Sequence, residues 1–358
     1  MAIHFHSLKV KEVKKQTPEC VSVTFDVPEE LKKDFAFTHG QNITLKKVID
    51  GEEARRSYSI CTAPFEKELT VAVKKVDGGK FSTYANEILK AGDTIDVLPP
   101  TGKFNTALDA ANKKNYTAFA AGSGITPVIS IIKTTLQAEP QSSFTLVFAN
   151  RSRASIIFFE ELEGIKNKYL QRFNFISLLT KERTDADIFF GRIDNTKLNQ
   201  LNKLIDYSKQ DEFFICGPEE MIFCVKDFLE AKGIEKKKVH FELFTTPGRN
   251  GKKSKEARKQ EAEKIKSLVQ IKLDGRTVGF PMGFESVSIL DEALKQGADL
   301  PFACKGGVCC TCKAKLLEGK VEMDVNWGLE EEELRQGFIL TCQSHPVTEK
   351  VVIDFDAR

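Results

Sequence analysis

Apolar and polar residues alternate with a period of two over most of the first 100 positions. This alternation is typical of antiparallel strands that bury one face. Turn sequences separate the alternating segments at Asp50–Gly51, Asp77–Gly79 and Ala91–Asp93. The segments themselves are residues 10–27, 41–48, 55–61 and 68–76. Strands this close together predict a small antiparallel β-barrel.

The periodicity changes at Tyr116, where short apolar segments begin to alternate with amphipathic ones. The apolar segments predict strands over residues 116–122, 144–151, 173–182 and 211–218. The amphipathic segments predict helices over residues 128–137, 156–168 and 219–233. Strands that alternate with helices are typical of βαβ units, so we expect an α/β domain with a parallel sheet and helices on both faces.

A third region begins with a charged segment. Residues 245–267 contain eight Lys or Arg and three Glu, and the few apolar side chains among them cannot form a core. The segment is either a solvated tether or a basic docking patch. After it, residues 269–282 predict a hairpin and residues 288–297 a helix. These changes predict a multidomain chain, with domains at 1–108, 109–244 and 268–358 and a charged linker at 245–267.

The composition narrows the class of protein. The chain has 358 residues, 41% of them hydrophobic and 29% charged, which fits two or three globular domains. We expect no membrane span, because no run reaches the ~18 apolar residues that one needs. The N-terminus lacks the order of a signal peptide, so we expect a cytoplasmic protein. A net charge of +2 and the lack of basic segments interleaved with aromatics argue against nucleic-acid binding.

Five of the nine cysteines lie in the last sixth of the chain. Clustered cysteines in a reducing compartment indicate metal or cluster ligation rather than disulfides. Cys304, Cys309 and Cys312 form C-x₄-C-x₂-C, and Cys342 follows later. This is the plant-type spacing of a [2Fe–2S] cluster held by four thiolates. A zinc site is the alternative, but zinc usually takes two separated C-x₂-C pairs. We expect Cys310 to point away from the irons.

The sequence around these cysteines resembles the plant-type ferredoxin family from Leu268 to Phe355. The resemblance rests on Leu300–Cys304 and on the LTCQSHP segment at residues 340–346. It implies an α+β domain of the β-grasp type. Within the cysteine loop, Gly306 and Gly307 allow backbone N–H groups to approach the sulfurs, and such hydrogen bonds help to set the reduction potential.

Arg56-Ser57-Tyr58-Ser59 lies on a predicted barrel strand. Taken alone, R-x-Y-S also fits ordinary strand residues. Ahead of an α/β domain, however, it resembles the flavin-binding signature of the ferredoxin–NADP⁺ reductase superfamily. The resemblance implies that Arg56 pairs with a flavin phosphate, that Tyr58 packs on the isoalloxazine ring, and that Ser59 lies near its reactive N5 atom. A guanidinium suits phosphate, and an aromatic face suits a flat ring.

A glycine turn at Gly78–Gly79 runs into a predicted helix. Such a turn presents backbone N–H groups to an anion. By resemblance to the superfamily, this segment holds the flavin pyrophosphate through Gly79, Lys80, Ser82 and Thr83, which favours FAD over FMN. In an alternative interpretation, Ser82 or Thr83 serves only as the N-cap of the helix.

The segment Gly122-Ser123-Gly124-Ile125-Thr126-Pro127 joins a predicted strand to a predicted helix. In this context a G-x-G loop fits a dinucleotide pyrophosphate at the helix N-terminus, where proline sacrifices no hydrogen bond. The segment resembles the nicotinamide-dinucleotide loop of the same superfamily. The resemblance assigns cofactor binding to Gly122, Gly124, Thr126 and Pro127.

Cys216-Gly217-Pro218 ends the fourth α/β strand and resembles a second signature of that superfamily. The resemblance implies that the Cys216 thiol lies near the nicotinamide–flavin contact, whereas a buried cysteine is otherwise an inert core residue. It also implies an acidic residue and an aromatic near the flavin. Glu242 and Phe244 are the candidates, although strand packing explains them nearly as well.

The choice between NADPH and NADH depends on the residues around the adenosine ribose. An acidic residue at the end of the second strand is typical of NADH binding. Residues 150–153 and 180–183 instead supply Arg and Lys. We therefore expect NADPH, or else NADH, with Arg151 and Arg183 near the cofactor. Solvated surface arginines are the alternative.

The order of barrel, α/β domain, linker and ferredoxin resembles the reductase components of multicomponent oxygenases. This implies an NAD(P)H oxidoreductase that contains FAD and a [2Fe–2S] cluster. It takes an electron pair from the nicotinamide and passes single electrons to an oxygenase or another metalloprotein. The residues implied nearest the reaction are Ser59, Cys216 and Glu242. Alternatives are a different acceptor (a desaturase, a hydroxylase or a free carrier) or a non-catalytic redox sensor.

Overall fold

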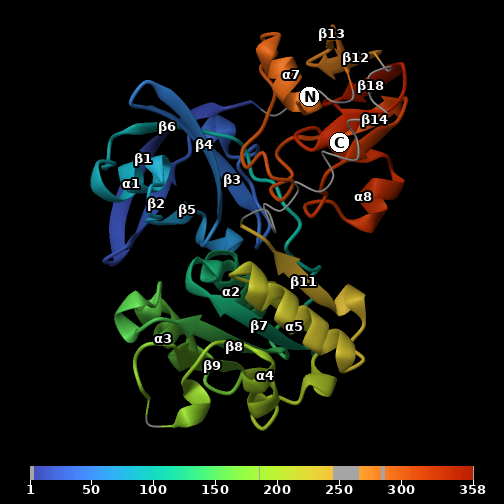
Figure 1. Ribbon diagram of the computed structural model, residues 1–358. Coiled ribbons are helices and arrows are strands. Elements are labelled where there is room, and N and C mark those ends of the chain that lie inside the picture. Colours follow the sequence, from blue (N-terminus) through green and yellow to red (C-terminus); the bar gives the residue numbers. More distant parts are fainter. Residues whose placement is uncertain (1–3, 185, 245–265, 284–286, 358) are drawn as a thin grey trace. The chain divides into compact units, whose positions relative to one another are not determined.

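The computed structural model describes residues 4–184, 186–244, 266–283 and 287–357 (Figure 1). The chain divides into two compact units, of which the larger contains two sheets and the smaller contains two others. The predicted linker, residues 245–267, lies outside the described residues except for Lys266 and Ser267, which begin a strand. Within the described ranges, every helix is too short or too polar to cross a membrane.

The first sheet of the larger unit is the predicted antiparallel barrel. Its strands are β1 (His6–Thr17), β2 (Cys20–Asp26), β3 (Asn42–Ile49), β4 (Glu52–Ser59), β5 (Leu69–Lys74) and β6 (Thr94–Val97), in the order β4-β3-β6-β1-β2-β5. Beyond β4, Ile60 pairs with Val71 of β5, so the two edges of the sheet meet. The sequence pattern missed β6, because four residues are too few to establish a period.

A short α-helix within the barrel segment packs against this sheet. α1 (Lys80–Glu87) follows β5 and buries Phe81 and Ala85 in the barrel core. Short 3₁₀ helices lie at Glu29–Leu31, Pro64–Glu66, Gly122–Gly124, Arg153–Ser155, Asp187–Phe189, Tyr207–Lys209 and Lys236–Lys238.

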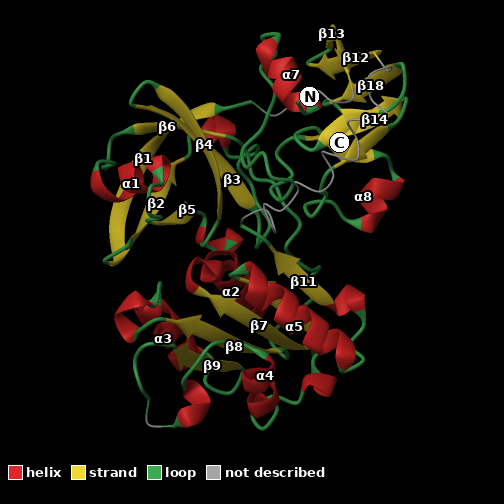
Figure 2. Cartoon of the chain, viewed as in Figure 1, coloured by secondary structure: helices red, strands yellow, loops and turns green. Residues whose placement is uncertain are grey.

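The second sheet of the larger unit is parallel, which confirms the predicted α/β domain. Its strands are β7 (Asn115–Ala121), β8 (Ser143–Asn150), β9 (Phe173–Leu179), β10 (Glu212–Cys216) and β11 (Val239–Glu242), in the order β11-β10-β7-β8-β9. The helices that flank it are α2 (Ile125–Ala138), α3 (Phe159–Lys168), α4 (Asn195–Leu201) and α5 (Glu219–Ala231) (Figure 2). The strand order reverses between β7 and β10. In such sheets, ligands bind beside the carboxyl ends of the strands at this switch point.

A buried lysine joins the barrel to the parallel-sheet domain. The Lys133 ammonium on α2 lies 2.7 Å from a Glu66 carboxylate oxygen of the barrel and 2.8 Å from one of Glu161 on α3. One turn earlier on α2, the Ser130 hydroxyl donates to the Thr62 carbonyl of the barrel at 2.7 Å. Only 9% of the Lys133 side chain is exposed, so water screens these contacts weakly. They hold α2 in a defined position against the barrel.

The smaller unit contains a mixed sheet of five strands. These are β12 (Lys266–Leu273), β13 (Arg276–Gly283), β14 (Lys313–Glu318), β16 (Phe338–Leu340) and β18 (Lys350–Asp354), in the order β13-β12-β18-β14-β16. β15 (Val321–Met323) pairs separately with β17 (Ser344–Pro346). The helices are α7 (Ile289–Lys295) and α8 (Glu331–Arg335). The predicted hairpin is β12 and β13, and the predicted helix is α7, whose N-cap Ser288 accepts the Asp291 N–H at 3.2 Å.

Candidate active site and cluster site

Two loops come into close contact at the switch point of the parallel sheet. One follows β7 and contains Gly122–Gly124, and the other follows β10 after Cys216. A Cβ atom on Gly124 would lie 2.0 Å from the Cys216 carbonyl oxygen, and a Cβ atom on Gly217 would lie 3.1 Å from that of Ala121. Gly124 is therefore a position where the backbones approach too closely for any side chain, whereas a Cβ atom on Gly217 would meet the Met221 side chain at 2.7 Å and the Ala121 backbone nitrogen at 3.2 Å.

The first turn of α2 lies directly beyond this contact. The Thr126 hydroxyl donates to the Ser123 carbonyl at 3.0 Å, which ties the loop to the start of the helix. Pro127 is in the first turn, where the helix makes no use of a backbone N–H. The Ile125 N–H at the start of the helix is already bonded to the Gly122 and Ser123 carbonyls, so the N–H groups of the preceding glycine turn are the ones that suit a pyrophosphate. The predicted residues thus shape the site through the backbone more than through their own side chains.

A barrel lysine that the sequence analysis did not select reaches the same loop. Lys74 ends β5, and its ammonium lies 3.8 Å from the position that a Cβ atom on Gly122 would occupy. It brings a positive charge to the place where a dinucleotide phosphate would bind. No sequence signal could identify it, because Lys74 is one of several strand lysines and only the fold brings it to this loop.

The three residues that the resemblance places nearest the reaction lie together. The Ser59 hydroxyl donates to a Glu242 carboxylate oxygen at 3.2 Å, across 183 residues of sequence. Cys216 and Glu242 are register partners on the adjacent strands β10 and β11. Burial and the nearby Glu242 carboxylate raise the pKa of the Cys216 thiol well above its ordinary value. The site therefore contains a neutral thiol, a hydroxyl and a carboxylate rather than a thiolate nucleophile.

The flavin motif occupies the end of β4. Alternation along a strand places Arg56 and Tyr58 on one face. The Tyr58 ring lies 5.7 Å from the Phe81 ring of α1, tilted by 36°. The Arg56 side chain is exposed, and its guanidinium donates to the Arg55 carbonyl at 2.7 Å. Ser57 is half-buried and Ser59 is buried. The strand thus presents a guanidinium and an aromatic ring together, as a flavin phosphate and ring require.

The glycine turn before α1 itself provides the N-cap of that helix. Gly79 is the N-cap of α1, so neither Ser82 nor Thr83 caps the helix. The Ser82 hydroxyl instead accepts the Val76 N–H at 3.1 Å and donates to the Gly79 carbonyl at 3.0 Å. Lys80 forms an ion pair with Glu52. The Ser82 hydroxyl thus holds the turn, and the N–H groups at the start of α1 are the donors for a phosphate.

The predicted arginines lie at the carboxyl ends of neighbouring strands. Arg151 follows β8, and its carbonyl accepts the Lys181 N–H from the loop after β9 at 2.8 Å. Arg183 on that second loop lies 5.4 Å from the centre of the Phe190 ring. The Glu182 carboxylate accepts the Arg153 N–H at 2.8 Å. An acidic residue therefore does reach the end of the second strand, which weakens the sequence-based argument for NADPH.

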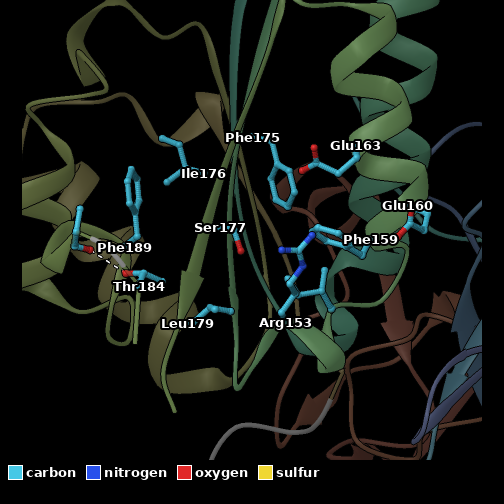
Figure 3. A pocket seen from close by; sticks show the side chains of 12 residues that line it. Arg153, Phe159, Glu160, Glu163, Phe175, Ile176, Ser177, Leu179, Thr184 and Phe189 are labelled. Carbon is cyan, nitrogen blue, oxygen red and sulfur yellow. Dashed lines mark hydrogen bonds between the residues drawn. The ribbon is translucent and has the colours of Figure 1, made fainter. Parts of the chain in front are cut away.

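Arg153 lines a separate cavity of 610 Å³ at the edge strand β9 (Figure 3). Its guanidinium lies 4.6 Å from the centre of the Phe159 ring. Phe175, Glu163 and Thr184 also line this cavity. Because β8 separates β9 from β7, the cavity is distinct from the switch point. Arg153 therefore lies on the α3 side of the sheet.

In the smaller unit, the four predicted ligand cysteines form two pairs. The Cys304 side chain hydrogen-bonds to Cys309, and the Cys312 side chain to Cys342. In the described ranges, no three His, Cys, Asp or Glu side chains converge closely enough to hold one metal ion. A single tetrahedral zinc needs four converging ligands, whereas a cluster with two irons takes two thiolates on each. The arrangement fits [2Fe–2S].

The backbone of the cysteine loop also fits a cluster. The Gly306 N–H donates to the Cys304 sulfur at 3.3 Å. Gly307 has φ +74°, and a Cβ atom there would lie 2.7 Å from a methyl of Val325. The Cys310 thiol donates to the Gly328 carbonyl, so this fifth cysteine is engaged away from the two pairs. The loop supplies N–H donors to sulfur, which stabilise negative charge on a cluster.

Three family models match consecutive parts of the chain. Residues 7–106 match the oxidoreductase FAD-binding domain, and residues 119–227 match the oxidoreductase NAD-binding domain. Residues 271–347 match the 2Fe-2S iron-sulfur cluster binding domain. FAD, a nicotinamide dinucleotide and a [2Fe–2S] cluster are thus the cofactors.

Relatives with similarity along nearly the whole chain belong to an epoxidase and a monooxygenase system. The chain is 46% identical to a component of the 1,2-phenylacetyl-CoA epoxidase of Escherichia coli (strain K12), over 99% of this chain and 98% of the relative. It is 33% identical to the ferredoxin reductase component of 3-ketosteroid-9-alpha-monooxygenase from Rhodococcus rhodochrous, over 97% and 96%.

Solved structures share the fold at lower sequence identity. Phthalate dioxygenase reductase matches with a TM-score of 0.58 and 24% identity, over 98% of both chains. An intact type IV self-sufficient cytochrome P450 monooxygenase matches with a TM-score of 0.69 and 20% identity, over 98% of this chain and 41% of that one. These matches confirm the predicted combination of barrel, parallel-sheet and ferredoxin-like domains.

Proposed function

The chain belongs to the ferredoxin–NADP⁺ reductase superfamily, in the group with a C-terminal plant-type [2Fe–2S] ferredoxin domain, and from this premise we propose that it is the reductase of a phenylacetyl-CoA epoxidase system. It is an NAD(P)H oxidoreductase that supplies electrons to an oxygenase component. The observation that carries the proposal is 46% identity along the full length of a component of that epoxidase. Its role is then in phenylacetate catabolism.

The bound cofactors supply the redox chemistry: FAD accepts an electron pair from NAD(P)H as hydride and returns the electrons singly to the cluster. The protein supplies the binding geometry. The glycine turn Gly122–Gly124 before α2 and the Lys74 ammonium would hold the dinucleotide pyrophosphate with N–H groups and positive charge. Gly124 lets the two loops close up beside Cys216, where the nicotinamide end of the dinucleotide would be held.

The hydrogen bond between Ser59 and Glu242 fixes the direction of the Ser59 hydroxyl proton. The Ser59 hydroxyl donates a hydrogen bond to the Glu242 carboxylate, so its oxygen keeps lone pairs for an N–H group of a bound ligand. Cys216 stays protonated because of burial and the Glu242 charge. A neutral thiol packs against an uncharged ring without competing as a nucleophile. Ser59 and Cys216 therefore orient the reacting rings rather than form covalent bonds with them.

Reconstitution with the oxygenase component of a phenylacetyl-CoA epoxidase tests this function. We expect NAD(P)H oxidation that depends on both the oxygenase and phenylacetyl-CoA, together with formation of the epoxide. The Cys309→Ser variant is the negative control, because it lacks a cluster ligand. NAD(P)H oxidation that does not depend on phenylacetyl-CoA, together with rapid turnover with a desaturase, a hydroxylase or a free carrier, would show that the proposed acceptor is wrong.

A redox sensor remains the competing function of a different class. A sensor needs one change of cluster state, whereas a reductase must turn over. Sustained NAD(P)H-driven reduction of cytochrome c and ferricyanide therefore separates the two. A pull-down with the reduced protein identifies the acceptor directly.

The finer assignments belong to the same proposal. NADPH is the preferred donor, supported by Arg151 and Arg183 and tested by the ratio of kcat/KM for NADPH and NADH. The domain boundaries are 1–108, 109–244 and 268–358, joined by 245–267. A cytoplasmic location is supported by the clustered thiols, which favour a reducing compartment.

A further inference from the structure

Gln343, directly after the fourth cysteine, spans the two segments of the cluster site. Its side-chain nitrogen Nε2 lies 3.0 Å from the Lys305 carbonyl oxygen, within the loop that carries Cys304, Cys309 and Cys312. The same nitrogen lies 2.9 Å from the Cys342 carbonyl oxygen and 3.6 Å from the Cys342 sulfur. One carboxamide thus contacts both the loop and the ligand that comes from elsewhere in the chain.

The Gln343 side chain is held in this position from several sides. Its backbone N–H donates to the Leu340 carbonyl at 2.9 Å, and its carbonyl accepts the Asp324 N–H at 2.9 Å. Its Cγ atom lies 3.1 Å from the position that a Cβ atom on Gly307 would occupy. The side chain is half-buried between these groups. Its Nε2 has two hydrogens, which face the Lys305 carbonyl on one side and the Cys342 carbonyl and sulfur on the other.

We propose that Gln343 is a positioning residue that fixes Cys342 against the cysteine loop and donates an N–H to its sulfur, which raises the reduction potential of the cluster. A reduced cluster carries one more negative charge than an oxidised one. An N–H donor to a ligand sulfur stabilises that charge and so favours reduction. The inference rests on the cluster of the proposed function but not on which acceptor the protein serves.

The neighbouring donors differ from Gln343 in what they connect. Gly306 donates a backbone N–H to Cys304, and the Thr311 side chain hydrogen-bonds to Cys309. Both belong to the loop that they contact, and the Gly307 N–H connects that loop to Cys342 through the backbone alone. Gln343 does so through Lys305. Its loss should therefore affect both the potential and the geometry around the second pair of cysteines.

Replacement of Gln343 by methionine tests the proposal on the purified full-length protein with both cofactors bound. Methionine keeps the length of the side chain but has no N–H donor. We expect the cluster midpoint potential to become more negative by the equivalent of about a tenfold change in the reduction equilibrium, about 59 mV for one electron. We also expect changed g-values in the EPR spectrum of the reduced cluster, and an unchanged flavin potential.

Gln296→Met is the matched control, because Gln296 is an exposed glutamine at the end of α7 in the same domain. It should leave the cluster potential and the EPR spectrum unchanged. A Gln343→Met protein with full iron content, the wild-type potential and wild-type g-values would overturn the proposal. Because no acceptor protein is present, this result would leave the reductase function intact, whereas a wild-type protein without a [2Fe–2S] EPR signal would refute that function.

If Gln343→Met does not assemble the cluster, the wild-type protein decides the question. Glutamine labelled with ¹⁵N at the side chain should give a hyperfine coupling to the reduced cluster in pulsed EPR. The Gln296→Met protein should keep this coupling. A labelled wild-type protein without the coupling would show that no glutamine amide donates to the cluster, and the proposal would fail.

Discussion

The cluster site and the flavin–nicotinamide site are assembled in opposite ways. Three of the four cluster cysteines come from one loop, so their spacing in the sequence is already close to their spacing in space. The Ser59–Glu242 hydrogen bond instead joins residues 183 positions apart, on different sheets. The first site depends on local backbone conformation, and the second on the topology of two domains. A substitution at one site should therefore disable that site, while the function of the other site can still be measured.

The largest expected effect comes from removing a cluster ligand. Cys309→Ser should abolish NAD(P)H-driven cytochrome c reduction, because the cluster cannot assemble with three thiolates and pass single electrons on. Ferricyanide reduction by the flavin should persist largely intact, because it requires only the other site. Iron content and visible absorption report the loss of the cluster. If both activities stayed at the wild-type level, the relay through the cluster would be wrong.

A substitution at the closest backbone contact should disrupt the flavin–nicotinamide site. Gly124→Ala places a Cβ atom 2.0 Å from the Cys216 carbonyl oxygen, so the two loops must separate. We expect kcat/KM for NADPH with ferricyanide to fall by about 100-fold, since displacements of this size disrupt the alignment of reacting groups. The cluster EPR spectrum should not change.

A matched glycine controls for this substitution. Gly164 lies within α3, and a Cβ atom there would meet nothing within 4 Å. Gly164→Ala should leave activity unchanged and stabilise the helix by about 0.5–1 kcal/mol. Equal activity in the Gly124→Ala and Gly164→Ala proteins would show that the close approach of the loops is not needed.

Removal of the long-range hydrogen bond should have a smaller effect. Ser59→Ala deletes the hydroxyl that connects the barrel to Glu242. Loss of one such bond, worth about 1.4 kcal/mol when the partner is charged, should slow flavin reduction about tenfold. Stopped-flow absorbance with excess NADPH measures this step. Ser59→Thr keeps the hydroxyl and should recover part of the rate of flavin reduction. If neither variant changed this rate, Ser59 would have no role in the reaction.

Replacement of Lys74 removes a positive charge that only the fold brings to the dinucleotide loop. Lys74→Met should raise KM for NADPH about fivefold and change kcat little, as expected for loss of about 1 kcal/mol of binding to an exposed phosphate. The effect should shrink at high salt. Lys203→Met, at an exposed lysine elsewhere in the same unit, is the control. An unchanged KM would place the pyrophosphate away from Lys74.

The smallest effect on activity is expected at the contact between barrel and nucleotide domain. Lys133→Met leaves Glu66 and Glu161 without their shared cation and should lower the free energy of unfolding by about 2 kcal/mol. Burial opposes the charged form of Lys133, but Glu161 and Glu66 outweigh it and raise its pKa above the ordinary value of 10.5. Its stabilisation is thus complete below that pH and is lost as pH rises through the raised pKa.

Denaturant unfolding at several pH values measures this contribution. The difference in stability between wild type and Lys133→Met should be constant near neutral pH and shrink in alkaline solution. A difference that grew with pH would contradict the assigned ion pairs.

The sequence by itself determined the elements whose signals are local. Alternation marked the barrel strands, and C-x₄-C-x₂-C marked the cluster, because each depends on residues close together in the chain. The glycines at 122, 124 and 217 were also recognisable, but the reason for Gly124 was not, because backbone from another loop requires it. The four-residue strand β6 and the N-cap of α1 at Gly79 had no distinct local signal and were missed.

The contacts between side chains from distant elements depend on the tertiary structure. It brought Lys74 to the dinucleotide loop, Glu182 to the end of the second parallel strand, and Gln343 to the cysteine loop. Lysine, glutamate and glutamine are common at surfaces, so their identities carry no signal. Their positions follow from strand order and register, which depend on contacts across the whole chain. Sequence patterns thus identified the chemistry, and topology assigned the residues around it.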